Sequence, residues 1–365
     1  MYKSVNGYGI ISLAIIVFAV VSCSVSPNVP ESPTRIVHQI ITKVISTPTT
    51  QDDSDNTIDA SESTPTITSL PKPLPTSTLS PIKSSYLAYT SARGGGSDIY
   101  IIQADGGEPQ QLTFGCGSGG DCENTAPSWS HDGSRIAFIS DRSGRYKGDF
   151  DIYILEVETG EISRLTNTDD LEVCPSWSPG DDYIAYDSDQ RDQPGMHIVS
   201  LLSGGRRVFG SEEVSQGLCP QWSANGEKIA YYCESDQFGQ ERKICIADAD
   251  GNNQRIIEGD YLGFGGFSWS PDSKFIVLVG STSINDFGLL LINTITEEIE
   301  LLRPVSGWAY SPTWSPDGNH IAFSSGGAWE NEIYIINSDG TGLLQLTEND
   351  FDDYDVSWAP VSLLR

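Results

Sequence analysis

Carboxylates and aromatic rings are concentrated in the segments that lead into six copies of a short tryptophan phrase. The residues of these segments with binding chemistry are Glu123, Asp170, Glu172, Phe264, Trp308, Tyr310, Asp353, Tyr354 and Asp355. Carboxylates hold cations, and aromatic faces stack on cations and on other rings. If the segments meet at one surface, they form a half-acidic, half-aromatic mouth suited to a cationic peptide, a sugar or a metal-bridged ligand. The alternative is that the rings pack between structural units and the acids are only solvated.

Catalytic groups are scarce by comparison. The chain contains no Gly-x-Ser-x-Gly, the elbow that carries the nucleophile of α/β-hydrolases. His131 and His320 fall in turns after tryptophan phrases, and His197 lies on an expected strand. The run Gly94–Gly96 stands between two expected strands with no helix after it, so hairpin flexibility explains it better than a phosphate loop. We therefore predict no catalytic residues.

Calcium is the one cofactor that the sequence raises. The run Asp248–Gly251 resembles the start of a calcium loop, but the distant Glu is missing at the required spacing. A second group of carboxylates lies between Asp141 and Asp151. Zinc is not favoured, because no Cys-x-x-Cys occurs. We predict no resident metal or cofactor and keep calcium as the alternative.

Net charge excludes one class of partner. The 365 residues include 50 acidic and 21 basic side chains, a net charge of −29. Nucleic-acid binding depends on Lys and Arg contacts to phosphate, so we expect no nucleic-acid partner. A cationic partner or a solvated acidic surface fits this balance.

The first residues read as a targeting segment. Lys3 precedes an apolar run of twelve residues from Ile10 to Val21, which is short for a membrane span and typical of a signal-peptide core. The run ends in Val-Val-Ser before Cys23, a pattern that resembles the bacterial lipobox. The resemblance implies a signal peptide over residues 1–22 and a lipid on Cys23; the alternative is a secretory peptide cut nearby. We expect an exported protein, lipid-anchored at the cell membrane or the outer surface.

A polar stretch follows over residues 23–83. Fifteen of the 21 residues from 61 to 81 are Ser, Thr or Pro. Such a segment cannot bury enough apolar surface to offset the entropy of ordering it. We predict a disordered stalk between the membrane and a folded domain.

Six further cysteines are expected to pair, because an exported chain reaches a disulfide-permissive compartment. The pairs that the sequence favours are Cys116–Cys122 across one Gly-rich loop, Cys233–Cys245 across one hairpin, and Cys174–Cys219 at the same position of neighbouring repeats.

The tryptophan phrase indicates the architecture. Its tryptophans are Trp129, Trp177, Trp222, Trp269, Trp314 and Trp358, separated by 48, 45, 47, 45 and 44 residues. A four-stranded propeller blade needs about this much chain. In each intact copy an Ile follows the tryptophan by seven residues and opens a short apolar run. Short, evenly spaced strands without helical periodicity predict an all-β fold.

The two ends of the repeat region predict how the ring closes. The first unit begins at Leu87 with what matches the second strand of the pattern, and the last unit stops at the Trp358 strand. Together these fragments make one blade. We therefore expect residues 84–365 to form a six-bladed β-propeller of four-stranded antiparallel blades, closed by pairing the Trp358 strand with the Leu87 strand.

The repeat resembles that of the TolB-like propellers. The resemblance covers residues 84–362 and is clearest in the phrase Trp314–Gly318, followed by Ile321–Phe323, Ile333–Tyr334 and Leu346–Thr347. It implies a propeller of a kind found in a periplasmic protein of an envelope complex and in serine peptidases. Where TolB has an N-terminal α/β domain, this chain has the Ser, Thr and Pro stretch.

These observations favour a non-catalytic role. We expect an envelope-anchored, monomeric lipoprotein whose propeller binds an envelope protein or peptide, a cationic one by charge, or acts as a scaffold. The alternative is a hydrolase or lyase that acts on a sugar or small molecule in the central channel.

Overall fold

The computed structural model describes residues 85–93, 95–115, 122–142, 148–210, 218–234, 242–282, 287–305, 307–327 and 330–360. The expected signal peptide, Cys23 and the stalk lie outside these residues. The described part is built from strands, and it holds no helix long and apolar enough to cross a membrane.

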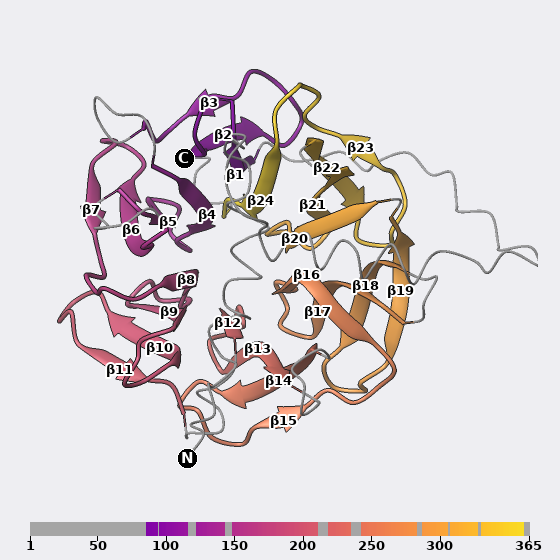
Figure 1. The fold of residues 1–365 in the computed structure, drawn as a ribbon. Helices are drawn as coiled ribbons and strands as arrows, with labels where there is room; N and C mark the ends of the chain where they lie inside the picture. The colour runs from indigo at the N-terminus through magenta and orange to yellow at the C-terminus, as the bar shows by residue number, and fades with distance from the viewer. Residues whose placement is uncertain are drawn as a thin grey trace, which may run out of the picture. The chain divides into compact units, whose positions relative to one another are not determined.

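The strands form six four-stranded antiparallel sheets arranged as a ring (Figure 1). Blade 1 contains β24 (Asp353–Trp358), β1 (Tyr86–Ser91), β2 (Asp98–Gln103) and β3 (Gln110–Gln111), and blade 2 contains β4 (Asn124–Trp129), β5 (Arg135–Ser140), β6 (Asp151–Glu156) and β7 (Ile162–Arg164). Blade 3 contains β8 (Glu172–Trp177), β9 (Tyr183–Ser188), β10 (Gly195–Ser200) and β11 (Arg206–Val208), and blade 4 contains β12 (Leu218–Trp222), β13 (Lys228–Glu234), β14 (Arg242–Asp248) and β15 (Arg255–Ile256). Blade 5 contains β16 (Leu262–Trp269), β17 (Phe275–Ser281), β18 (Phe287–Asn293) and β19 (Ile299–Pro304), and blade 6 contains β20 (Trp308–Trp314), β21 (His320–Gly327), β22 (Glu330–Asn337) and β23 (Leu344–Gln345).

The residues after each tryptophan build the turn from the inner strand to the second strand. In blade 5 the Ser270 hydroxyl donates to Asp272 at 2.6 Å, and Asp272 accepts the backbone N–H of Lys274 at 3.1 Å. These hydrogen bonds, led by that from Ser270, lower the pKa of the Asp272 carboxyl. The turn aligns Trp269 with Ile276, as the seven-residue spacing predicts.

The Ser-Trp pair of the phrase joins neighbouring blades. The indole N–H of Trp177 donates to the carbonyl of Ser128 at 2.9 Å, in the preceding blade. The backbone N–H of Trp222 donates to the Ser176 hydroxyl at 3.1 Å. Both contacts run from one inner strand to the next, so the phrase holds the ring together and is part of its architecture.

A left-handed residue stands three positions before each of the six tryptophans of the phrase. The φ angle is 49° to 55° at the five residues that are not glycine and 100° at the sixth, and the positions are Ala126, Cys174, Cys219, Gly266, Ser311 and Asp355. In all six inner strands the register with the second strand shifts across this residue. A left-handed backbone costs roughly 1–2 kcal/mol outside glycine. The five bulges without glycine therefore need stabilising contacts, which neighbouring blades provide.

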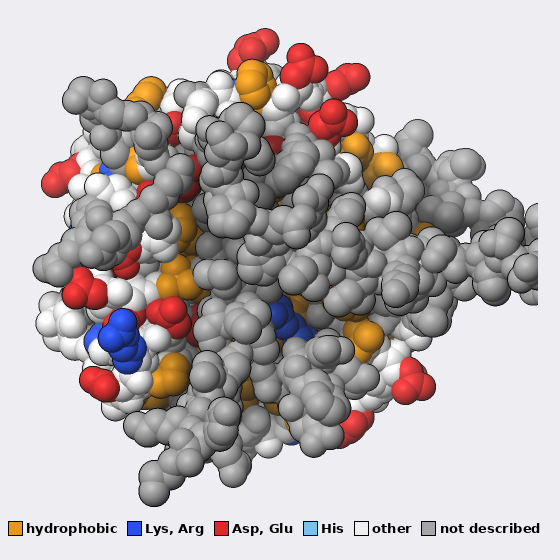
Figure 2. Space-filling view, in the orientation of Figure 1, with side chains coloured by type: hydrophobic (Ala, Val, Ile, Leu, Met, Phe, Trp, Pro, Cys, Tyr) orange, Lys and Arg blue, Asp and Glu red, His pale blue; other side chains and the backbone are white. Residues whose placement is uncertain are grey.

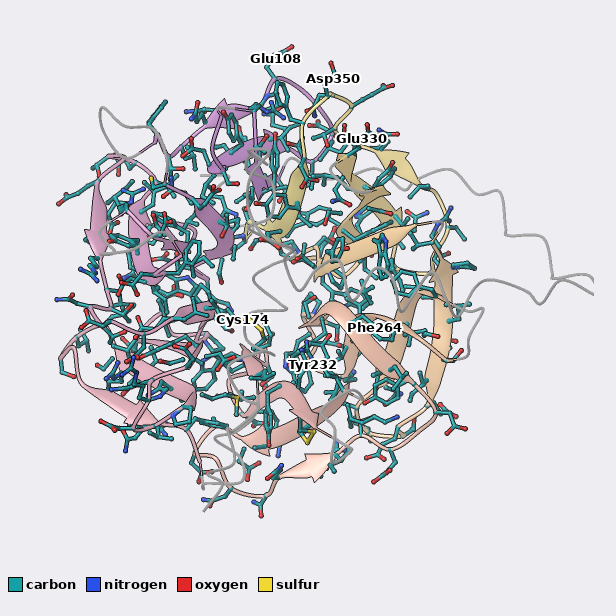
Figure 3. All side chains as sticks on the ribbon, viewed as in Figure 1. Glu108, Cys174, Tyr232, Phe264, Glu330 and Asp350 are labelled. Atoms are coloured by element: carbon teal, nitrogen blue, oxygen red, sulfur yellow. A yellow bond between two sulfur atoms is a disulfide. The ribbon has the colours of Figure 1, made fainter. Side chains whose placement is uncertain are left out.

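Two side-chain links cross between these bulges. Cys174 and Cys219 form a disulfide with 5.0 Å between their Cα atoms. On the other side of the ring, the Ser311 hydroxyl donates to Asp355 at 3.0 Å. Figure 3 shows Cys174 close to the centre of the domain.

Two of the three expected disulfides are confirmed. Besides Cys174–Cys219, Cys233 and Cys245 are bonded across the hairpin of β13 and β14. Cys122 is also disulfide-bonded, and its expected partner, Cys116, lies outside the described residues.

The expected closure of the ring is confirmed. β24 pairs antiparallel with β1, with Trp358 opposite Leu87. The Trp358 indole N–H donates to the Ser85 hydroxyl at 2.8 Å, and the N–H of Ala359 donates to the carbonyl of Tyr86 at 2.8 Å. Of the described strands, the last, β24, thus completes the blade that the first, β1, begins.

Removing the closing indole should destabilise the domain strongly. Trp358 is 6% exposed, and deleting a buried Trp side chain costs about 3–5 kcal/mol. We expect Trp358→Ala to lower the free energy of unfolding by that amount in urea denaturation. Trp308→Ala is the matched control, because this ring is 45% exposed and its loss costs less than about 1 kcal/mol. Equal losses in the two variants would contradict closure through β24.

The disulfide between bulges should stabilise more than the hairpin disulfide. Cys174–Cys219 closes a loop of 45 residues and Cys233–Cys245 one of 12. Chain entropy assigns about 4 and about 3 kcal/mol to loops of these lengths. We expect the double variant Cys174→Ser, Cys219→Ser to lose more free energy of unfolding than Cys233→Ser, Cys245→Ser. A smaller loss in the first variant would show that the link between blades is not constraining the ring.

Candidate functional site

The expected mouth lies where the inner strands begin. β4, β8, β16, β20 and β24 start there and run toward their tryptophans, and Figure 1 shows the inner strands around the centre of the ring. Figure 3 shows Phe264 on β16, beside the centre. The side chains predicted to bind at this face divide into two groups with different environments.

Glu123 belongs to the first group, the carboxyls that are buried. It is 1% exposed, and its Oε2 accepts the backbone N–H of Ser97 at 3.0 Å. Its own N–H donates to Asp141 at 2.8 Å. The carboxylate thus joins blade 1 to the strand that starts blade 2 and faces no solvent.

Glu172 is fully buried at the start of β8. The Thr168 hydroxyl donates to its Oε1 at 2.9 Å, and Arg206 lies 3.5 Å from the same oxygen. Burial raises the pKa of Glu172 to about 7, against the effect of the two threonine hydroxyls and Arg206. Asp170 is half-buried beside it, with its carbonyl accepting from Thr168 at 3.2 Å.

Asp353 forms the most extended of these networks. Its side chain is buried, and Arg93 donates to it at 3.0 Å while Asn349 donates at 2.9 Å. The Arg93 guanidinium lies 4.9 Å from the centre of the Tyr100 ring. The backbone N–H of Asn349 also donates to Glu332 at 2.6 Å. Asp353 therefore ties β24 to β1 and to the last turn of blade 6.

Tyr354, Asp355 and Tyr310 are also held internally. Tyr354 is 5% exposed, and its hydroxyl hydrogen-bonds the Ser97 hydroxyl at 3.0 Å. Burial raises the pKa of Asp355 to about 6, although the hydrogen bond from Ser311 opposes the shift. Burial, with the nearby Asp352 charge, raises the pKa of the half-buried Tyr310 to about 12.

Asp187, Arg93 and Arg142 also lie at this site and were not predicted from the sequence. Asp187 is 4% exposed, and burial raises its pKa to about 7 although the amides of Ser188 and Cys219 donate to it. Arg93 and Arg142 each follow the end of a second strand by two residues. Arg93 donates to the buried Asp353, and Arg142 donates to the buried Asn124 side chain at 2.7 Å. An Arg at the same position of two blades was the signal in the sequence.

Phe264 and Trp308 form the second group, with Phe287 between them. Phe264 is 47% exposed and Trp308 45% exposed. The Phe287 ring centre lies 6.2 Å from that of Phe264 and 6.0 Å from that of Trp308, edge-on to the indole. We call these three residues the aromatic cluster. It spans blades 5 and 6, and Phe287 was not predicted because its strand is the third one of blade 5.

A close backbone contact positions the aromatic cluster. A Cβ on Gly265 would lie 2.4 Å from the carbonyl oxygen of Ala309 and 3.0 Å from Val279. β16 and β20 therefore approach each other more closely than any other residue type would allow at this point. Because Phe264 and Trp308 are each next to these residues in sequence, their rings project from a rigid seam.

The other blades serve as an internal control for Phe264. Four residues occupy its position, five before the tryptophan, and all are 1% exposed or less: Asn124, Glu172, Ala309 and Asp353. Blade architecture therefore needs no aromatic ring here. The exposed ring of Phe264 is an addition to the repeat.

The expected calcium positions have internal partners where they are described. Asp248 pairs with Lys228 and accepts from the Asn253 amide at 2.6 Å. Asp250 accepts the backbone N–H of Asn252 at 2.9 Å. Within the described ranges, no three His, Cys, Asp or Glu side chains converge as a metal site. These carboxylates order turns.

The chain resembles proteins of known name and structure. A family model described as TolB beta propeller domain matches residues 227–362. The Protein TolB homolog of Chlorobium luteolum is 32% identical over 210 residues, 58% of this chain and 35% of that protein. A Tol-Pal system protein TolB of Francisella tularensis is 26% identical over 239 residues, 63% of this chain and 52% of that protein. The chain thus spans about a third to a half of these two relatives.

The solved structure of TolB from Acinetobacter baumannii matches with a TM-score of 0.62 and 18% identity, over 76% of this chain and 67% of that one. At 18% identity this match is evidence for the fold alone. Sequence model, relatives and the six-bladed ring agree with one another. The described residues form a TolB-like β-propeller.

Proposed function

We propose that this chain is an exported envelope protein, anchored through a lipid on Cys23, whose propeller binds a partner protein or peptide through the aromatic cluster. The observation that carries the proposal is the pair of half-exposed rings, Phe264 and Trp308, on a rigid seam between two blades. No metal or cofactor enters the proposal.

Exposed aromatic rings on a rigid backbone suit protein binding. Aromatic anchors that lose little conformational freedom contribute much of the binding energy at protein interfaces. Phe264, Phe287 and Trp308 provide three such rings in one chain of contacts. They are held by β16, β18 and β20, all in the packed part of the domain.

The proposed partner is an envelope protein or peptide that carries positive charge. One relative is named Tol-Pal system protein TolB and another is named Protein TolB homolog. These names support an envelope role for this chain. Acidic side chains are spread around the periphery of the face seen in Figure 2. With a net charge of −29, the surface attracts a partner segment that carries Lys or Arg beside its apolar residues.

A hydrolase or lyase would need an acid and a base open to substrate. At this face the carboxyls of Glu123, Glu172 and Asp353 are buried, each with hydrogen-bond or ion-pair partners. We therefore assign these carboxyls a structural role and assign partner binding to the aromatic cluster.

Removing the two exposed rings should weaken partner binding and leave the fold intact. We expect Phe264→Ala with Trp308→Ala to weaken binding by at least roughly 30-fold, because a single hot-spot residue contributes about 2 kcal/mol or more. The measurement is recovery of envelope proteins on the immobilised full chain, followed by the Kd of each recovered protein by surface plasmon resonance.

The matched control removes two exposed apolar side chains from the opposite strand ends. Leu202→Ala with Leu343→Ala should leave both recovery and Kd unchanged, since these residues are 87% and 46% exposed in or beside turns between third and fourth strands. Equal loss in both double variants, or none in the first, would contradict the proposal.

The pH dependence of stability tests the structural role of the acids. Burial raises the pKa of Glu172 and Asp187 to about 7, whereas both are near 4 in an unfolded chain. The folded state holds protons that the unfolded chain has lost, so this stability is present at low pH and is lost between about pH 4 and 7. We expect unfolding in urea to require more free energy at pH 5 than at pH 8.

Glu172→Gln should flatten that pH dependence by on the order of 1 kcal/mol or more, because the amide has no proton to lose. The control is Glu158→Gln, at an exposed turn, which should leave the dependence unchanged. A full drop between pH 5 and 8 in the Glu172→Gln variant would show that Glu172 titrates in contact with solvent.

A further inference from the structure

The outer strand of blade 5 differs from the other five outer strands. β19 has six residues, whereas β3, β7, β11, β15 and β23 have two or three each. Figure 1 shows β19 on the periphery of the ring, and of the described strands only β18 pairs with it. Proteins usually keep edge strands short, because unpaired backbone groups can pair with another strand. β19 therefore offers a longer edge than the other blades do.

The backbone of β19 turns two residues away from β18. At the start of the pairing, the N–H of Asn293 donates to the carbonyl of Glu298 at 2.9 Å. Along an antiparallel strand, successive residues direct their N–H and C=O alternately toward the paired strand and away from it. The backbone groups of Glu298 and Glu300 therefore face β18. Those of Ile299 and Leu301 face outward, and no hydrogen bond from another described residue reaches them.

The second half of β19 is closed to another strand. Its register with β18 shifts after Leu301. A Cβ on Gly340 would lie 2.4 Å from the carbonyl oxygen of Leu302, so a turn of blade 6 covers this point. Pro304, the last residue of the strand, has no N–H to donate. The open edge is therefore the stretch from Ile299 to Leu301.

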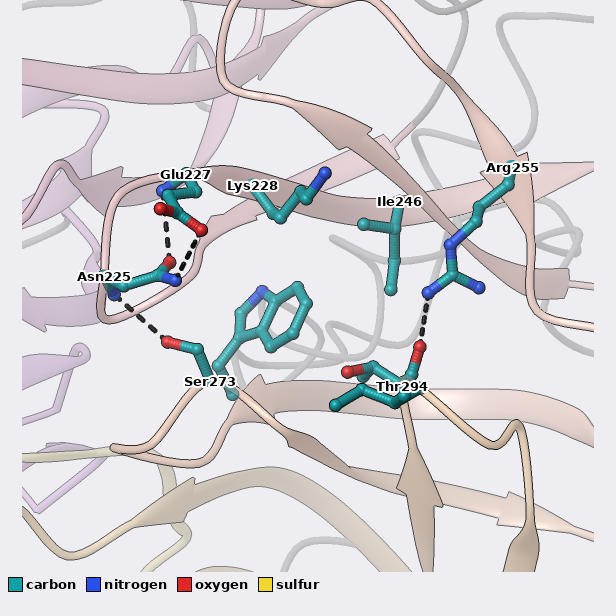
Figure 4. Close-up of a pocket in the computed structure, with 9 residues that line it drawn as sticks. Asn225, Glu227, Lys228, Ile246, Arg255, Ser273 and Thr294 are labelled. Atoms are coloured by element: carbon teal, nitrogen blue, oxygen red, sulfur yellow. Dashed lines mark hydrogen bonds between the residues drawn. The ribbon is translucent and has the colours of Figure 1, made fainter.

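The turn that leads into this open edge is fixed to blade 4. Arg255 of β15 donates to the carbonyl of Thr294, as Figure 4 shows, and it pairs with Glu297. A Cβ on Gly259 would lie 2.6 Å from the Cδ1 of Ile299, so the loop after β15 lies against the first residue of β19. An edge that is ordered in advance loses little conformational entropy when it pairs.

Negative charge surrounds the open edge. Four exposed carboxylates lie on β19, in the turn before it or in the loop after β15, and they are Glu258, Asp260, Glu298 and Glu300. None of them forms an ion pair with another described residue. A strand that suits this edge should therefore combine β-branched side chains with positive charge.

The chain itself carries such a segment outside the described residues. Residues 35–45 contain six Ile or Val residues together with Arg35 and Lys43, and they contain no carboxylate. The residues from 46 to 84 that follow this segment span up to about 130 Å when extended. A domain of about 280 residues has a radius of gyration of about 19 Å. The segment can therefore reach any blade of its own propeller.

We propose that residues 35–45 pair with the open edge of β19 as a fifth strand of blade 5. Their N–H and C=O groups form hydrogen bonds with the outward groups of Ile299 and Leu301. Their two cations lie among the four carboxylates around the edge, which selects this edge over the shorter ones. Being intramolecular, the pairing occurs at an effective concentration in the millimolar range, as for two sites joined by a flexible linker.

The docked segment would shorten the free part of the stalk. Only residues 24–34 would then separate Cys23 from the propeller, and eleven extended residues span at most about 40 Å. This consequence rests on the lipid proposed on Cys23, whereas the docking itself depends neither on that lipid nor on the aromatic cluster. A lipid-anchored propeller would thus be held close to the membrane.

Hydrogen exchange of the full chain, resolved to single amides, tests the docking. In the unaltered chain we expect protection of the outward N–H groups of Ile299 and Leu301, although no described strand bonds to them. Ile40→Pro with Ile41→Pro removes an N–H that faces the edge in either register, because neighbouring residues point in opposite directions. We expect both outward amides to exchange at least about tenfold faster in this variant. Lack of protection in the unaltered chain, or unchanged exchange in the variant, would overturn the proposal.

The matched control places two prolines outside the segment. Thr57→Pro with Ile58→Pro should leave exchange at both outward amides unchanged, and thermal unfolding of the two variants should show that the propeller is kept. Equal acceleration in both variants would show that residues 35–45 are not the occupant. Protection that is lost when the protein is diluted about tenfold would assign the edge to a second copy of the chain. Either result would overturn the proposal.

Discussion

The contact between neighbouring inner strands is the constraint on which this domain depends. Five of the six inner strands carry a left-handed residue other than glycine, which is unfavourable by itself, and neighbouring inner strands hold each other through the tryptophan phrase. The disulfide Cys174–Cys219 and the hydrogen bond between Ser311 and Asp355 reinforce this ring. A single blade has none of these partners, so stability belongs to the closed ring and not to its repeats.

The same constraint separates the acids from the rings at the face where the inner strands begin. Acids next to the inner strands are buried by ring formation and need partners, which Arg93, Arg206 and the threonine hydroxyls provide. The aromatic cluster is placed at the seam where Gly265 lets two backbones meet. The predicted half-acidic, half-aromatic mouth therefore consists of two separate parts. One is a network of buried acids with a structural role, and the other is the exposed aromatic cluster.

The fold and the closure of the ring were predictable because they follow from the spacing of the repeated strands. Trp358 without a blade of its own and Leu87 without an inner strand leave a single way to pair, and the structure contains it. Cys174 and Cys219 were predictable for a similar reason, since equal repeat positions meet in adjacent blades. In each case the spacing in the sequence already determined the distance in the fold.

The state of the site residues was not predictable in that way. Glu172 depends on Arg206, which lies 34 residues away on the outermost strand of the blade. Phe287 joins the aromatic cluster from the third strand of blade 5, where no tryptophan phrase marks it. Burial of an acid and exposure of a ring both depend on contacts between strands, and the repeat pattern describes only the strands themselves.

The aromatic cluster is proposed to bind the partner, and the buried acids are proposed to stabilise the fold. Hydrogen exchange of the full chain, with and without a recovered envelope partner, tests this assignment most directly. We expect new protection at the beginnings of β16 and β20, around Phe264 and Trp308, with no change around Glu172 or Asp353. Protection concentrated at Glu172 and Asp353, with Phe264 and Trp308 unchanged, would contradict it.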